Sequence, residues 1–279
     1  MSRGVPAVLC LTALLLLHTS GEATTPPDRC TSPPHGSTLV TVGQDLPVAL
    51  TEGVDSSALL RDLFREIHGK PLGSVALKNL LIHSARDLDP RGPDPCFGHG
   101  VADPGLAARI LRAAVLEDKR PDLARGSLVG ALSDLVDPEL EHQGTTPRLP
   151  VFALIAEGSL NQGESLAFHI PVVPARELRA TLVWHGPPAG VLVNDIDLRL
   201  EAPNGEVVLP WAPDPSRPFE AARQGRNSRD DVEQVRVPIP SVGWWTAIVE
   251  GYSVAAGPQA FSLILSVSRG NEAESRSEP

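Results

Sequence analysis

Three segments decide the fold: Leu178-Arg-Ala-Thr-Leu-Val-Trp184, Asn194-Asp-Ile-Asp-Leu-Arg-Leu-Glu201 and Phe261-Ser-Leu-Ile-Leu-Ser-Val267. In each of them an apolar residue recurs at every second position, which is the pattern of a strand with one buried face. The same alternation occurs at Leu166, Phe168, Ile170, Val172, Val235, Val237 and Ile239. The sequence therefore predicts an antiparallel, jelly-roll-like β-sandwich over residues 158–268.

The N-terminal half has helical periodicity instead, so we expect a mixed α and β protein. Residues 57–69 place Leu59, Leu63 and other apolar side chains on one helical face and end at a glycine. Residues 74–85 and 104–116 predict two more helices, which begin at Ser74 and after Asp103. Residues 24–56 predict an irregular lead-in, 117–150 a connector, and 269–279 a disordered tail.

The first 23 residues resemble a secretory signal peptide, with Arg3 before an apolar run and small residues near Ala23. The alternative is an uncleaved membrane anchor, but the apolar run is shorter than the roughly 20 residues that span a bilayer. We therefore expect a secreted protein with no membrane span after signal removal. Cys30 and Cys96 would remain, either as one disulfide or as two unpaired thiols.

Composition limits the partners. The formal net charge of -10 argues against nucleic acid, because phosphate binding requires clustered Lys and Arg. The possible partners are then a protein or a polysaccharide surface, and we expect a monomer.

Several motifs resemble the secreted alkaline members of the subtilisin-like serine protease (subtilase) family. Leu80-Leu-Ile-His-Ser-Ala85 is similar to a helix of their catalytic domain, and Phe97-Gly-His-Gly-Val-Ala-Asp103 to the turn before its last helix. The alternating segments then resemble the β-sandwich that follows that domain. The resemblance implies that residues 57–150 are a helical remnant whose parallel sheet is largely absent. We expect these helices to pack on one another or on the sandwich, loosely and with exposed apolar patches.

No catalytic triad of the family is evident in the sequence. His99 lies in a Gly-His-Gly-Val-Ala segment like that of the family's catalytic histidine, but no nucleophile motif follows it. Thr31-Ser32 lacks the preceding glycine and is followed by two prolines, which cannot begin a helix. His83 and Ser84 are adjacent on one predicted helix and cannot face each other. We expect no catalytic residues here, although the family consists of serine endopeptidases.

The Asn194-Asp-Ile-Asp197 segment has metal-ligand chemistry. Asp195 and Asp197 would lie on the same strand face and present carboxylate oxygens, which suit calcium. The resemblance also implies calcium here, although the later acidic loop of the family has lost most of its acidic residues in 214–225. The alternative is that both carboxylates only face solvent. The histidines show no zinc-ligand spacing.

Three functional hypotheses follow. The first is a non-catalytic, subtilase-related module that stabilises or binds. The second is a serine endopeptidase whose catalytic residues lie outside this chain or are not recognised. The third is a carbohydrate- or surface-binding sandwich in which Trp211, Trp244 and Trp245 could form a platform, against the alternative that they pack in the core.

Overall fold

The computed structural model describes residues 37–41, 47–51, 56–88, 91–94, 97–118, 149–186, 192–214, 216–217 and 220–269. Side chains are described in these ranges except at 37–51, 117–118, 149–151 and 269. All of these residues belong to one compact unit of the chain. The predicted signal peptide, both cysteines of the predicted disulfide, Ser32 and nearly all of the predicted tail lie outside the described residues.

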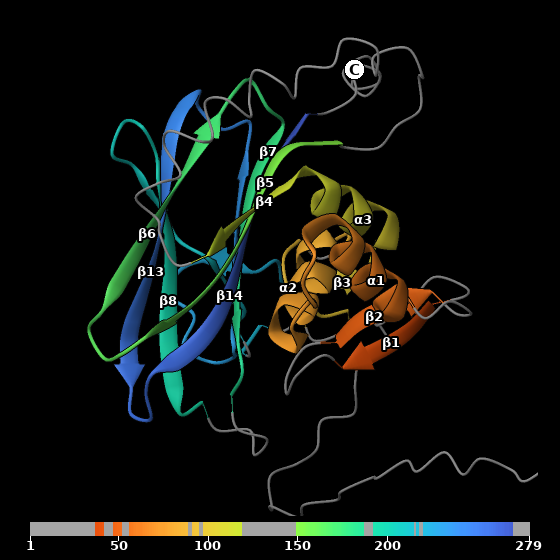
Figure 1. The fold of residues 1–279 in the computed structure, drawn as a ribbon. Coiled ribbons are helices and arrows are strands. Elements are labelled where there is room, and N and C mark those ends of the chain that lie inside the picture. The colour runs from red at the N-terminus through yellow and green to blue at the C-terminus, as the bar shows by residue number, and fades with distance from the viewer. Residues whose placement is uncertain are drawn as a thin grey trace, which may run out of the picture. The chain divides into compact units, whose positions relative to one another are not determined.

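Two sheets form the sandwich (Figure 1). The first has the order β12 (Val232–Pro238), β7 (Glu177–Trp184), β14 (Gln259–Arg269), β5 (Leu149–Leu160) and β4 (Ala114–Asp118). The second has the order β6 (Ser165–Val172), β13 (Gly243–Val254), β8 (Asn194–Glu201) and β9 (Val207–Val208). From β5 to β8 each strand lies in the other sheet from the strand before it, and the same holds from β9 through β12 and β13 to β14. This order confirms the predicted jelly roll.

The core between the sheets follows the predicted alternation. Leu178, Leu182 and Trp184 are fully buried in it, together with Ile196 and Leu200 from the opposite sheet. Ile239 is the exception, because it lies beyond the end of β12 and is 73% exposed. The alternation in the sequence predicted a strand that includes Ile239, but β12 ends at Pro238.

The helices cover the outer face of the first sheet (Figure 1). They are α1 (Ser56–His68), α2 (Ser74–Ser84) and α3 (Pro104–Ala113), close to the predicted bounds. A second core joins Leu80 and Leu111 of the helices to Ile155, Val183 and Ile264 of the sheet. The sheet hides most of the helices' apolar side chains, so the expectation of exposed apolar patches is wrong for most of this layer, although Leu59 and Ile67 of α1 remain exposed.

Two predicted boundaries also need correction. Residues 37–41 and 47–51 are not irregular, since they form β1 (Ser37–Thr41) and β2 (Pro47–Thr51), which pair in antiparallel. β3 (Gly100–Val101) pairs in parallel with β2. The sandwich begins before residue 158, because β5 starts at Leu149 and β4 adds an edge strand in parallel with it. A short ribbon of β10 (Trp211–Ala212) and β11 (Arg223–Gln224) completes the strands.

Candidate functional site

Helix α2 carries polar side chains into the interface with the sheet. Lys78, Asn79 and His83 are all buried there, so each must find polar partners to offset its lost hydration. Asn79 donates through Nδ2 to the carbonyl oxygens of Thr181 and Ser262, at 2.9 and 2.8 Å. Lys78 forms an ion pair instead, with its Nζ 2.7 Å from Asp231 Oδ1.

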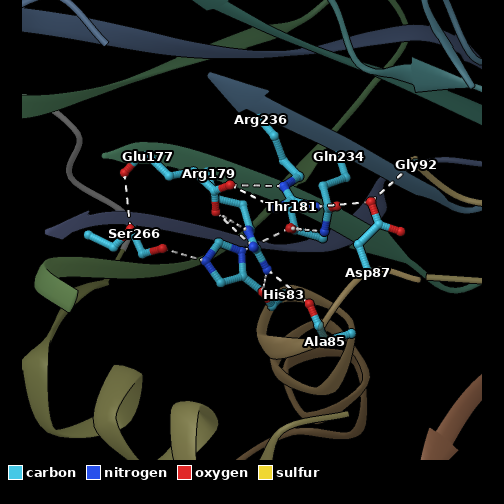
Figure 2. Close-up of polar contacts among 11 residues, drawn as sticks. His83, Ala85, Asp87, Gly92, Glu177, Arg179, Thr181, Gln234, Arg236 and Ser266 are labelled. Atoms are coloured by element: carbon cyan, nitrogen blue, oxygen red, sulfur yellow. Dashed lines mark hydrogen bonds and ion pairs between the residues drawn. The ribbon is translucent and has the colours of Figure 1, made fainter. Parts of the chain in front are cut away.

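His83 bridges two strands through both ring nitrogens (Figure 2). Its Nδ1 lies 2.8 Å from Thr181 Oγ1 on β7, and its Nε2 lies 2.8 Å from Ser266 Oγ on β14. Burial, and then the charge of Arg179, hold the pKa of His83 well below its ordinary value. The ring is therefore neutral, with one nitrogen donating and the other accepting. His83 is buried because every residue of α2 from Ala76 to Ser84 is buried.

A chain of charged groups continues from His83 along the sheet (Figure 2). Arg179 donates to the carbonyl oxygens of His83 and Ala85 and pairs with Glu177, with its Nη2 2.7 Å from Oε1. Glu177 also pairs with Arg236, whose Nη2 lies 2.8 Å from Oε2. Burial alone would raise the pKa of Glu177, but the two arginines outweigh it and lower the pKa to about 2.

The distance between His83 and Ser266 suits a general base and its nucleophile, but the environment of the two side chains does not suit catalysis. Both side chains are buried, so a substrate has no route to the hydroxyl. The second ring nitrogen meets the Thr181 hydroxyl rather than the carboxylate that orients the base of a triad. The contact is suited to holding α2 against the sheet.

The predicted calcium motif divides between two roles. Asn194 points to the loop after β13, where its Nδ2 donates to Ala256 O and its Oδ1 accepts from Ala256 N. Asp195 and Asp197 both contact one guanidinium, that of Arg226. Its Nη2 lies 2.7 Å from Asp195 Oδ2 and its Nε lies 3.1 Å from Asp197 Oδ2.

Arg226 is therefore the cation between the two predicted ligands. Its Cζ lies 3.1 Å from the centre of the Tyr252 ring, which adds a cation–π contact. Burial still raises the pKa of Asp195 and of Asp197 despite this guanidinium. Within the described residues, no group of three or more His, Cys, Asp or Glu side chains could hold a metal ion.

Glu233 adds a buried carboxyl near these aspartates. Its Oε2 accepts a hydrogen bond from the backbone N–H of Leu198, so it links edge strand β12 to β8 across the sandwich. Burial, and then the neighbouring aspartates, raise its pKa well above the ordinary value. No sequence pattern indicated this residue, because its role depends on the pairing of two sheets.

The turn that carries His99 has both of its glycines, Gly98 and Gly100, at positive φ. Gly100 has a φ of 99°, and a Cβ there would lie 2.1 Å from Arg86 O, so only glycine fits. His99 lies in this turn rather than on a helix, and burial lowers its pKa to about 4. The interpretation of this segment as a turn is confirmed.

The outer face of the second sheet carries mainly polar side chains. We call it the open sheet face; its outward side chains are Ala167, His169, Asp195, Asp197, Arg199, Glu201, Trp244, Thr246, Ile248 and Glu250. Arg199 pairs with Glu250, with its Nη1 2.8 Å from Oε2, and more distantly with Glu201. None of the three described helices shares a core with this face.

The predicted tryptophan platform does not form as a unit. Trp245 is buried in the sandwich core, and Trp211 is half-buried beneath the guanidinium of Arg91. Trp244 points the other way and is 37% exposed on the open sheet face. Adjacent residues on a strand face opposite sides of the sheet, which explains why the side chains of Trp244 and Trp245 point in opposite directions.

No protein-family model matches this sequence, and no curated protein matches it either. Similar solved structures include Bacillus licheniformis lipase BlEst2 in its propeptide form, with 16% identity and a TM-score of 0.27 over 47% of this chain and 26% of that chain. Aeromonas hydrophila PliG, a periplasmic inhibitor of g-type lysozyme, has 19% identity and a TM-score of 0.26 over 41% of this chain and 85% of that one. CBM35 from Cellvibrio japonicus Abf62 has 15% identity and a TM-score of 0.23 over 41% and 78%.

These likenesses are too low to carry a function. Among the described residues, no helix is both long enough and apolar enough to cross a membrane.

Proposed function

We propose that this chain is a secreted, subtilase-related binding module that holds a neutral polysaccharide on the open sheet face. The observation that carries the proposal is the difference between the two outer faces of the sandwich. Helices cover one of them through a continuous apolar core. The other presents Trp244 and an ordered set of charged side chains instead.

The charged groups favour a polysaccharide over a protein partner. Protein interfaces are depleted of Asp and Glu at their centres, because those groups lose hydration there. This face carries three partly exposed carboxylates, Asp197, Glu201 and Glu250, beside the buried Asp195. Sugar hydroxyls can donate to such carboxylates while water remains around them, and the Trp244 ring offers an apolar surface to a pyranose ring.

The balance of charge favours a neutral polymer. Four carboxylates on the face are countered by two guanidiniums, those of Arg199 and Arg226. A polymer of uronate or sulfate groups would meet net repulsion, which weakens association.

Affinity electrophoresis tests this proposal. The chain is run in gels that contain soluble xylan, laminarin or hydroxyethylcellulose, and in parallel gels that contain alginate. We expect retardation by a neutral polymer, none by alginate, and at least a tenfold weaker effect for Trp244→Ala. Leu59→Ala is the control, because Leu59 is 60% exposed but lies on α1. Migration unchanged by every neutral polymer, or retardation that Trp244→Ala leaves intact, would reject the proposal.

A serine endopeptidase is the second candidate, and the 2.8 Å contact between His83 and Ser266 is the observation in its favour. Burial of both groups is the argument against it. Cleavage of fluorescent casein that is lost in Ser266→Ala, but retained in Ser262→Ala, would favour the peptidase.

The calcium expectation at Asp195 and Asp197 does not fit the residues around them. The Arg226 guanidinium occupies the space between the two carboxylates that a calcium ion would need. We propose that Arg226 supplies the positive charge there in place of a metal ion.

A further inference from the structure

Ser74 and His185 form a second polar pair, at the surface and far from the open sheet face. Ser74 Oγ lies 3.3 Å from His185 Nε2, and both residues are exposed. They are 111 positions apart in the sequence and meet because α2 begins over the end of β7. A serine hydroxyl within reach of an exposed imidazole is the arrangement of a nucleophile and its general base, and such contacts are often long before substrate binds.

Ser74 is also the first residue of α2, after the N-cap Gly73. The first backbone N–H groups of a helix have no acceptor within the helix, and the helix dipole places partial positive charge there. Those of Ser74 and Val75 therefore lie beside the hydroxyl. Donors at that position can hold an oxyanion that forms on a carbon attacked by Ser74.

The two residues are held by neighbours that are themselves fixed. The Lys78–Asp231 ion pair lies one turn further along α2 and is largely buried. Asp231 O accepts from the backbone N–H of Trp184, the residue before His185, at 3.1 Å. The helix start and the strand end are thus tied to the same residue, which limits their relative motion.

We infer that Ser74 and His185 act as a hydrolytic dyad on small esters, a function beyond the proposed polysaccharide binding. Ser74 Oγ attacks the ester carbonyl carbon while His185 Nε2 takes the hydroxyl proton and the carbonyl electrons move onto oxygen. The C=O bond then re-forms and expels the alcohol, which takes the proton from His185. Water repeats these steps on the Ser74 acyl ester, which releases the carboxylic acid and restores the serine.

The charges around the pair select the substrate. Glu157 Oε1 lies 3.3 Å from the place that a Cβ on Gly73 would take, so a carboxylate stands beside the helix start. It would repel an anionic acyl group. The chemistry therefore favours esters that are uncharged or cationic.

The test uses the whole chain with a fluorophosphonate probe and with p-nitrophenyl acetate. We expect the probe to label Ser74, as identified by peptide mass mapping, and we expect heat denaturation to abolish the labelling. Ser74→Ala should abolish both labelling and ester hydrolysis above the buffer rate. His185→Gln should lower both by at least about 100-fold, the typical contribution of a general base. Melting temperatures close to wild type for both variants show that the fold is intact.

Ser216→Ala is the matched control, because Ser216 is an exposed serine whose hydroxyl bonds to Asp214 rather than to a histidine. It should change neither readout. The dyad is refuted if native wild-type chain shows no label on Ser74, or labels Ser74 and Ser216 equally. Hydrolysis that survives in Ser74→Ala refutes it as well. None of these outcomes depends on polysaccharide binding, so the two proposals fail separately.

Discussion

The two outer faces of the sandwich use the same residue types for opposite purposes. Both have arginines paired with glutamates, Arg179 with Glu177 beneath the helices and Arg199 with Glu250 on the open sheet face. The first pair is almost inaccessible, with side-chain exposures of 7% and 13%, whereas the second is exposed to 33% and 40%. The first pair is therefore buried within the fold, whereas the second is accessible from solvent.

The largest difference between the faces should appear when one arginine is removed from each. Arg179→Ala leaves Glu177 buried with one partner fewer and frees two carbonyl oxygens, so we expect a loss of about 3–5 kcal/mol. Arg199→Ala, on β8 of the second sheet, should lower the free energy of unfolding by less than about 1 kcal/mol. Urea unfolding followed by circular dichroism measures both. Equal losses would contradict the distinction between the two faces.

The helical layer should unfold together with the sandwich rather than before it. Leu80→Ala removes a side chain with no exposed surface from the core that α2 shares with the sheet, which should cost about 2–5 kcal/mol. Leu59→Ala, at an exposed position of α1, should change stability by less than about 0.5 kcal/mol. A single unfolding transition for both variants, with similar amide protection in α2 and β14, is the expected result. Early exchange of all three helices would support the loose remnant that the sequence suggested.

Acid should lower the free energy of unfolding through Glu177, which lies beneath the helices on the outer face of the first sheet. Its pKa is about 2 in the folded chain against 4.5 for an ordinary glutamate, so the folded state binds its proton less readily than the unfolded state. Its contribution is therefore complete above about pH 5 and is lost as the pH falls toward 2. Glu177→Gln should cost about 3 kcal/mol at pH 7, and the difference from wild type should narrow toward pH 2.

The measurement is urea unfolding at several pH values, with Glu201→Gln on the open sheet face as the control. Glu201 is 39% exposed, so this variant should follow the wild-type pH profile. A constant gap between Glu177→Gln and wild type would show that the ion pairs are not the cause.

Strand alternation predicted the sandwich because its signal is local. Each inward residue from Leu178 to Trp184 is apolar whatever the strand pairs with. The covering of the first sheet was harder to predict, because Val183 and Ile264 occupy positions expected to be wet, and they make those strands apolar on both faces. This double-sided pattern is the signal that could have located the helical layer.

The candidate sites were less predictable because their partners are distant in sequence. Asp195 and Asp197 were identified as a pair, but Arg226 comes from a loop 29 residues beyond Asp197. The sequence identified Ser74 only as the start of a helix. Nothing local to it indicates His185, because the two residues are 111 positions apart in the sequence.

The smallest effect concerns the cation on the open sheet face. Arg226→Ala removes a partly exposed guanidinium, so it should cost about 1 kcal/mol or less by thermal melting. If Arg226 stands in for a metal ion, EDTA should leave the melting temperature of the wild type unchanged. Millimolar calcium should then stabilise Arg226→Ala, because Asp195 and Asp197 would face each other without a positive charge. Arg223→Ala, whose guanidinium is exposed and pairs only distantly with Glu220, is the control and should not respond to calcium. A wild-type melting temperature that falls in EDTA would mean that a metal ion binds alongside Arg226, and that the open sheet face depends on it.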